Sequence, residues 1–167
     1  MTPKNNIIRL LDQRKIPYRA YTLPPEKLGA VETARLLGVD AALIYKTLVV
    51  IRPEKGKPIL ALVPGDSELD LKLLAKAVGE KKVILPSQRE AERLTGLQAG
   101  GISPLALLQR GFQVILDSSA QEHAEIHVSG GERGLNIRLP VAALVELTGA
   151  RFAPISQKSH GVDLSHE

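Results

Sequence analysis

The chain has 167 residues, of which 44% are hydrophobic, 24% charged and 3% aromatic, and it carries a net charge of +4 with no cysteine. This length fits one domain, and the lack of cysteine excludes a disulfide scaffold, a cysteine-ligated zinc and a thiol nucleophile belonging to the protein. The scarcity of aromatic residues argues against a base-stacking platform, and the mild basic excess permits a nucleic-acid partner without requiring one.

The N-terminal residues have the apolar spacing of an amphipathic helix and lack the apolar core of a signal peptide. No apolar run in the chain approaches the roughly 20 residues that a membrane span requires. We therefore expect a cytoplasmic protein without a membrane partner.

Helices are predicted from apolar spacing and from end signals. Asp66 or Ser67 can cap the third helix, Ser87 with Glu90 has the spacing of a capping box, and Ser103-Pro104 combines a cap with an N1 proline. The expected helices span residues 4–15, 30–37, 67–78, 88–94, 105–110 and 140–148.

Strands are predicted at residues 42–51, 59–63, 82–85, 112–116, 126–129 and 135–139. Alternation in the last strand directs Leu135, Ile137 and Leu139 inward and Asn136 and Arg138 outward. Short strands mixed with helices, some of them hairpin-linked, predict a single α+β domain with a mixed or mostly antiparallel sheet. We expect the domain to cover residues 1–156 and a polar, loose tail to cover 157–167.

The stretch ALIYKTLVVI, residues 42–51, places Lys46 at the centre of an apolar strand. Strand geometry puts Lys46 on one face with Ile44, Leu48 and Val50. A lysine in such a row usually pairs, loses its proton or lines a cavity for an anionic or carbonyl ligand. The simpler alternative is a lysine on an edge strand whose long stem reaches water.

Two glycine-rich stretches are candidate backbone sites. Gly100-Gly101 precede the capped turn at Ser103-Pro104, where free N–H groups can hold a phosphate or polarise a carbonyl; a plain tight turn is the alternative. Residues 129–134 resemble a nest of amides between two strands, and a simple hairpin is the alternative there.

Metal and triad chemistry are not supported by the pattern. His123 and His127 have i, i+4 spacing, but His127 lies in a predicted strand, where that spacing does not suit a metal. Carboxylates fall at helix starts, where capping accounts for them. We therefore expect no metal and no cofactor.

The chain resembles the YbaK/EbsC family in an ordered set of motifs that extends over nearly its whole length. YKTLVV occupies residues 45–50, GGISPL 100–105, VSGG 128–131 and RGL 133–135. Further matching segments lie at residues 69–79, 81–83 and 95–96. The resemblance implies a free-standing editing domain related to the insertion domain of bacterial prolyl-tRNA synthetase. It also implies a mixed α/β fold around a largely antiparallel, barrel-like sheet flanked by helices.

The resemblance further implies a Cys-tRNA(Pro) deacylase, in which the cysteinyl thiol of the substrate attacks its own ester and releases a thiolactone. Lys46 matches the essential lysine of the family, and Gly101 matches the backbone element near the reacting ester. Aminoacyl-tRNA is the implied substrate, and prolyl-tRNA synthetase is a candidate partner. The residues expected to bind the substrate are Tyr45, Thr47, Gly100, Ile102, Ser103, Pro104, Ser129 and Gly130.

The sequence departs from residues common in the family at Leu23, Leu28 and Ala106. The identity of the amino acid that is removed from the tRNA is therefore left open between cysteine and another small amino acid such as alanine. Two other classes of function also stay open. One is a non-catalytic module that binds tRNA or a synthetase, and the other is an enzyme whose Lys46 forms a Schiff base.

Overall fold

The computed structural model describes residues 5–54 and 56–159. Within these ranges the helices are α1 (Asn6–Gln13), α2 (Ala30–Leu37), α3 (Leu71–Val78), α4 (Gln88–Thr95) and α5 (Val141–Thr148). The strands are β1 (Arg19–Thr22), β2 (Tyr45–Val50), β3 (Ile59–Pro64), β4 (Ser67–Leu69), β5 (Gln113–Asp117), β6 (Glu125–Ser129), β7 (Leu135–Pro140), β8 (Arg151–Ala153) and β9 (Ser156–Lys158). Short 3-10 turns lie at η1 (Ala41–Leu43), η2 (Pro104–Ala106) and η3 (Ser118–Glu122).

The strands form three sheets of mixed direction. One sheet has the order β2-β3-β5-β8, with β2 and β3 antiparallel and the other two pairings parallel. The orders β1-β7-β6 and β4-β9 describe two antiparallel sheets. A single parallel bridge between Ile44 and His127 links the first two sheets. The expected α+β domain with mostly antiparallel pairing is confirmed.

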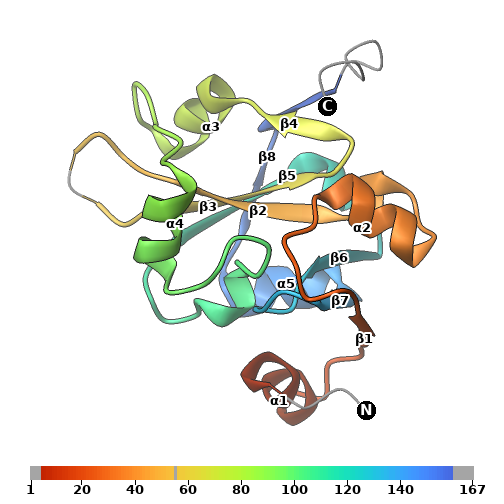
Figure 1. The fold of residues 1–167 in the computed structure, drawn as a ribbon. Coiled ribbons are helices and arrows are strands. Elements are labelled where there is room, and N and C mark those ends of the chain that lie inside the picture. The colour runs from red at the N-terminus through yellow and green to blue at the C-terminus, as the bar shows by residue number, and fades with distance from the viewer. Residues whose placement is uncertain (1–4, 55, 160–167) are drawn as a thin grey trace.

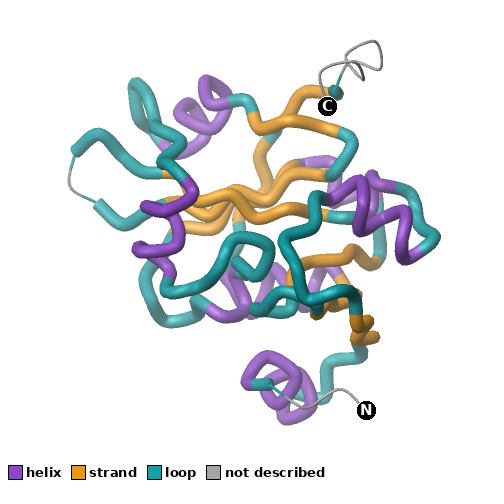
Figure 2. Tube along the Cα trace, in the orientation of Figure 1, coloured by secondary structure: helices purple, strands orange, loops and turns teal. Residues whose placement is uncertain are grey.

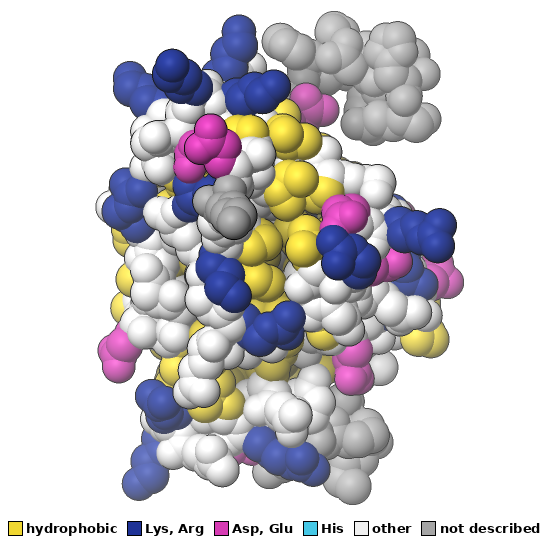
Figure 3. Space-filling view, turned by 90° about the vertical axis from the view of Figure 1, so that its left-hand side faces the viewer, with side chains coloured by type: hydrophobic (Ala, Val, Ile, Leu, Met, Phe, Trp, Pro, Cys, Tyr) yellow, Lys and Arg dark blue, Asp and Glu magenta, His cyan; other side chains and the backbone are white. Residues whose placement is uncertain are grey.

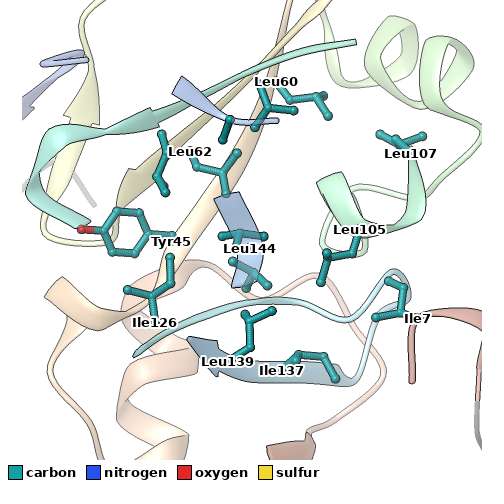
Figure 4. Packing of buried hydrophobic residues seen from close by; sticks show 14 of the residues in the cluster. Ile7, Tyr45, Leu60, Leu62, Leu105, Leu107, Ile126, Ile137, Leu139 and Leu144 are labelled. Carbon is teal, nitrogen blue, oxygen red and sulfur yellow. The ribbon is translucent and has the colours of Figure 1, made fainter. Parts of the chain in front are cut away.

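Strand β3 is buried on both faces and separates two hydrophobic clusters. Leu60 and Leu62 belong to the larger cluster, together with Tyr45, and Figure 4 shows these side chains facing those of β6, β7 and α5. Ile59 and Val63 point the other way, into a smaller cluster that α3 covers. In Figure 1 the four-stranded sheet accordingly lies between α3 on one side and β6, β7 and α5 on the other. Alternation along one strand thus builds two cores.

Several residues that were predicted to cap or begin helices do so in the structure. Ser87 Oγ accepts from the Glu90 N–H, Ser103 Oγ accepts from the Leu105 N–H, and Pro140 directly precedes α5. Gly38 ends α2 in a left-handed conformation, with φ at 70°.

Four predicted elements are wrong in position or type. The strand expected at 42–51 begins only at Tyr45, because residues 41–43 form the 3-10 turn η1. Asp70, not Asp66 or Ser67, caps α3, because residues 67–69 pair with β9 as strand β4. The helix expected at 105–110 is one 3-10 turn, since the chain turns away at Gln109, whose φ is 68°. Of the strand expected at 82–85, Ile84 alone pairs, in a bridge with Ile51.

The first residues of the expected loose tail belong to a sheet. Gln157 and Lys158 belong to β9, and Lys158 Nζ donates to Asp66 Oδ2 at 2.6 Å. Residues 160–167 of that prediction lie outside the described residues. No helix in the described part of the chain is long and apolar enough to cross a membrane.

The buried carboxylate of Asp117 holds the end of β5 to two other segments. Its oxygens accept from the Ile155 N–H at 2.9 Å and from the N–H and hydroxyl of Ser119 at 3.2 and 2.5 Å. Because the Ser119 hydroxyl donates to Asp117, the Tyr45 hydroxyl is the donor in its 2.7 Å bond to Ser119 Oγ. A chain of hydrogen bonds therefore runs from β2 to the segment between β8 and β9.

We expect Asp117→Ala to lower the free energy of unfolding by about 3 kcal/mol, because it leaves buried donors without an acceptor. Tyr45→Phe, which removes one neutral bond at the end of the same chain, should cost about 1 kcal/mol. Urea unfolding of the two variants beside the unchanged protein measures both values. Equal losses would contradict the central place given to the carboxylate.

Candidate functional site

A cavity of about 470 Å³ lies along the open edge of β2. Its walls come from β2, the loop before α2, the start of α4 and the two glycine-rich stretches. Figure 2 shows the loops before α2 and after α4 next to each other, close to β2. The volume lies in the range of small-molecule sites, and the chain segments that enclose it are far apart in sequence.

The cavity opens where β2 and β6 diverge. The two strands meet at the Ile44–His127 bridge, which does not continue into a ladder. Beyond the bridge, Thr47 on β2 and Ser129 on β6 both line the cavity. The fold therefore leaves one edge of β2 unpaired at the point where the walls separate.

Lys46 lines this cavity and is half-buried. Its neighbours on the same face, Leu48 and Val50, contact the smaller hydrophobic cluster, as the alternation predicted. Burial lowers the pKa of Lys46, while the charges of Glu68 and Asp66 act in the opposite direction. No described residue accepts a hydrogen bond from its ammonium group. The result is a partly desolvated cation that is available to a ligand.

Tyr45 is among the residues that line the cavity, but its ring is buried in the protein interior. Its side chain is 1% exposed and packs in the larger cluster, where the hydroxyl bonds to Ser119. Burial raises the pKa of Tyr45 to about 12 despite that hydrogen bond, so the phenol stays protonated. Sequence alternation had placed Tyr45 opposite Lys46, and the structure assigns that opposite face to the core.

Thr47 contributes an unsatisfied polar atom to the site. Its Oγ1 is buried and has no hydrogen-bond partner among the described residues, and Thr47 lines the cavity. Buried hydroxyls are bonded in most folded proteins, so an unpaired one beside a cavity indicates a place for a ligand or water. The prediction of Thr47 as a site residue is consistent with this position.

One part of the first glycine-rich stretch lines the cavity, and another part makes backbone contacts outside it. Gly100, with φ at 92°, and Ile102 line the cavity, whereas Gly101 does not. The Gly101 N–H donates to the Gln98 carbonyl at 2.8 Å, so this amide is already engaged. A Cβ on Gly101 would lie 2.8 Å from the Glu132 Cα, which makes the position a close backbone contact.

Ser103 and Pro104, also predicted at the site, lie outside the wall of the cavity. Both side chains are buried, and Ser103 caps the short turn η2 through its bond to the Leu105 N–H. Their position supports the alternative of a capped turn for this part of the stretch.

The second glycine-rich stretch is the hairpin between β6 and β7. Ser129 lines the cavity, and its Oγ accepts from the Gly131 N–H at 3.2 Å and donates to the Gly100 carbonyl at 3.4 Å. Gly130 does not line it and instead bonds to the Leu135 carbonyl. Arg133 Nε donates to the Ala99 carbonyl at 2.7 Å, so the two stretches brace each other.

Asn136 was predicted to face solvent, and that prediction is wrong. It lies on the face opposite Leu135 and Ile137, as expected, but this face forms a wall of the cavity and Asn136 is 5% exposed. Its Oδ1 accepts from His127 Nδ1 at 2.8 Å, which leaves His127 Nε2 buried without a partner among the described residues. Burial lowers the pKa of His127 and favours its neutral form.

No group of three potential metal ligands occurs among the described residues. His123 and His127, which share the i, i+4 spacing, lie at the end of η3 and inside β6. The extended backbone between them separates the two rings, as the strand prediction implied.

Sequence reasoning missed the residues that close the front of the cavity. Lys27 Nζ donates to Gln88 Oε1 at 2.7 Å and joins the loop before α2 to the start of α4. Leu85 lines the cavity and is 51% exposed. The sequence offered no signal for either Lys27 or Leu85, because loop residues carry no periodicity.

Comparison with known proteins gives consistent results. Residues 24–147 match the aminoacyl-tRNA editing domain family. The chain is 40% identical, over 93% of its length and 94% of the relative, to a protein of Enterococcus faecalis named as the Cys-tRNA(Pro)/Cys-tRNA(Cys) deacylase EbsC. It is 28% identical over 137 residues to the proline–tRNA ligase of Geobacter metallireducens, of which it spans 23%.

Solved structures agree with these sequence matches. The hypothetical protein APE2540 superposes with a TM-score of 0.82 at 27% identity, covering 92% of this chain and all of that one. A protein described as a trans-editing enzyme for prolyl tRNA synthetase gives a TM-score of 0.75 at 26% identity, over 93% and 99% of the two chains. With the match over residues 24–147, these findings show that the chain belongs to the aminoacyl-tRNA editing domain family.

Proposed function

We propose that this protein is a trans-editing deacylase that removes cysteine from mischarged tRNA(Pro). The observation that carries the proposal is Lys46, a half-buried cation without a described hydrogen-bond partner on the wall of the cavity. Neither cysteine nor histidine is among the described residues that line this cavity. A substrate that brings its own nucleophile suits such a site.

In the proposed reaction the cysteinyl sulfur attacks the carbonyl carbon of its own ester. The new C–S bond closes a thiolactone while the ester C–O bond breaks, and the proton lost by the thiol ends on the released ribose hydroxyl. The protein has to fold the aminoacyl end into this geometry and stabilise the charge that develops on oxygen. Lys46 anchors a phosphate or carbonyl oxygen, Thr47 and Ser129 bind the substrate, and Gly101 supports the wall through its backbone contact.

A polyanionic substrate is also compatible with the surface. Figure 3 shows the side of the molecule that carries the β2–β3 hairpin loop, with lysine and arginine side chains spread around an apolar strip. The net charge of +4 is modest, so binding of free tRNA should be weak and should fall with salt. Prolyl-tRNA synthetase is the candidate partner that would supply selectivity for the tRNA body.

The lowered pKa of Lys46 favours one alternative, an amine that forms a Schiff base. Borohydride reduction in the presence of a carbonyl substrate would trap that adduct on Lys46. We expect no adduct, because the proposed role needs the ammonium form.

Lys46→Ala should reduce the deacylation of Cys-tRNA(Pro) by about 10²–10³-fold, since it removes the cation that faces the developing charge. Single-turnover loss of labelled cysteine measures the rate, with Ala-tRNA(Pro) and Pro-tRNA(Pro) as comparison substrates. Lys72→Ala is the matched control, because Lys72 is exposed on α3 and does not line the cavity. Unchanged turnover in a folded Lys46→Ala protein would remove Lys46 from the mechanism.

The deacylation rate should fall as pH rises through the lowered pKa of Lys46, below the ordinary lysine value of 10.5, because the group acts while protonated. Lys46→Arg should move this loss to higher pH, since guanidinium keeps its charge there. The pH profile of the single-turnover rate, corrected for uncatalysed ester hydrolysis, tests both statements. A profile that is identical for the two side chains would show that another group titrates.

Thr47→Val should lower the deacylation rate about tenfold without lowering the free energy of unfolding. The substitution removes a buried hydroxyl that the folded protein leaves unpaired, so the only loss is a bond to the substrate. Thr47→Ser, which keeps the hydroxyl, is the matched control for the rate. Urea unfolding of all three proteins separates the two effects, and a destabilised Thr47→Val protein would mean that the hydroxyl has a structural partner.

A further inference from the structure

The direction of each backbone group along β2 can be fixed from three hydrogen bonds. The Gly65 N–H donates to the Ile44 carbonyl at 2.7 Å, on the side of β3. Ile51 and Ile84 exchange two bonds of 2.8 and 2.9 Å on the opposite side. Antiparallel pairing alternates between the two sides, so even-numbered residues of β2 bond to β3 and odd-numbered residues face the open edge.

Thr47 and Val49 are therefore the odd-numbered residues left between the His127 bridge and the Ile84 bridge. On this side no described strand pairs with β2 at Thr47 or Val49, because the bridges to His127 and Ile84 are isolated, and both residues line the cavity. Val49 is only 3% exposed, so this unpaired backbone is not an ordinary wet sheet edge. Buried backbone groups are almost always paired in folded proteins, which indicates that the cavity supplies the partner.

The two groups that flank Leu48 define the chemistry of that partner. The Thr47 carbonyl accepts and the Val49 N–H donates, side by side and toward the same cavity. A planar group with a donor next to an acceptor matches this pair, and adenine has that arrangement at its N6 amino group and the adjacent ring nitrogen. Apolar side chains of Leu23, Leu85 and Leu135 also line the cavity and can contact the faces of a ring.

We propose that the open edge of β2 binds the terminal adenine of the tRNA acceptor end. The Thr47 carbonyl accepts from the N6 amino group, and the Val49 N–H donates to the neighbouring ring nitrogen. This inference rests on the proposed function for the identity of the ligand as an aminoacyl-adenosine end. Lys46 precedes Thr47 on the same strand, so the base and the aminoacyl group occupy neighbouring parts of one cavity.

Amide hydrogen exchange measured by NMR tests the site without any catalytic step. The probe is the trinucleotide CCA, and at about ten times its Kd the exchange of the Val49 amide should slow roughly tenfold. Amide chemical shifts give the internal control, since the shift of the Val49 amide should change on binding whereas that of the Leu48 amide, which faces β3, should change much less. CCA that ends in purine riboside, which lacks the N6 amino group, should bind about ten- to a hundredfold more weakly.

Replacing the terminal base by 1-deazaadenosine or by 7-deazaadenosine identifies the ring nitrogen. Weaker binding with one of them supports the pairing and assigns it to N1 or to N7. Full affinity with both, or unchanged Val49 exchange with CCA, would overturn the adenine site.

The adenine site and the proposed function fail in different ways. Protection of Val49 by CCA without deacylation of any mischarged tRNA would keep the site and reject the deacylase. Lys46-dependent removal of cysteine, at the same rate from tRNA that ends in adenosine or in purine riboside, would keep the deacylase and reject the site.

Discussion

The structure depends on the constraint that β2 is buried on both faces but is open at one edge. Its odd-numbered side chains, such as Tyr45 and Val49, pack in the larger cluster, and Leu48 and Val50 pack against the smaller one. The strand cannot rotate or slip by one residue without exchanging these two sets. The hydrogen-bond chain from Tyr45 through Ser119 to Asp117 fixes the same register from the far side. The backbone groups at the open edge are consequently held in place by two cores.

That constraint also explains how the protein tolerates Lys46. A fully buried ammonium would cost several kcal/mol unless it were paired. A fully exposed ammonium would be strongly hydrated, and its flexible side chain would not be held in one position toward a ligand. Lys46 lies between these limits, because it is half-buried and lines the cavity. Glu68 and Asp66 are near enough to favour the charged form without a direct bond. Lys46 is thus a lysine on an edge strand, as one sequence interpretation had it, and it also lines a cavity, as the other had it.

Local patterns predicted those parts of the fold that local physics determines. The lysine strand, the Ser87 cap and the proline before α5 each depend on residues within one turn or one strand. The cap of α3 could not be chosen from sequence, because Asp66, Ser67 and Asp70 all have suitable side chains and only pairing with β9 excludes the first two.

The candidate site shows the same division. Lys46 could be found because it interrupts an apolar strand, and Thr47 was found only through the family resemblance. Lys27 and Leu85 reach the cavity through loops that no spacing rule describes. Asn136 was assigned to solvent because alternation reports which face a residue takes and not what covers that face. The nonlocal approach of β2 and β6 decides this point, and a single sequence does not contain it.

The glycine-rich stretches serve the site mainly by letting backbones approach each other. A Cβ on Gly101 would meet the Glu132 backbone, and one on Gly130 would lie 2.4 Å from Leu135 Cγ. Loss of activity on substitution of either glycine would therefore report a displaced wall and not a missing catalytic group. Besides Glu26, Lys27 and the amides of Gln88 and Asn136, the described wall contains Lys46, a few hydroxyls and the open edge of β2, which are groups that can position a substrate. Under the proposed function, discrimination then follows from the substrate, because only an aminoacyl group with its own thiol can complete the reaction that this arrangement favours.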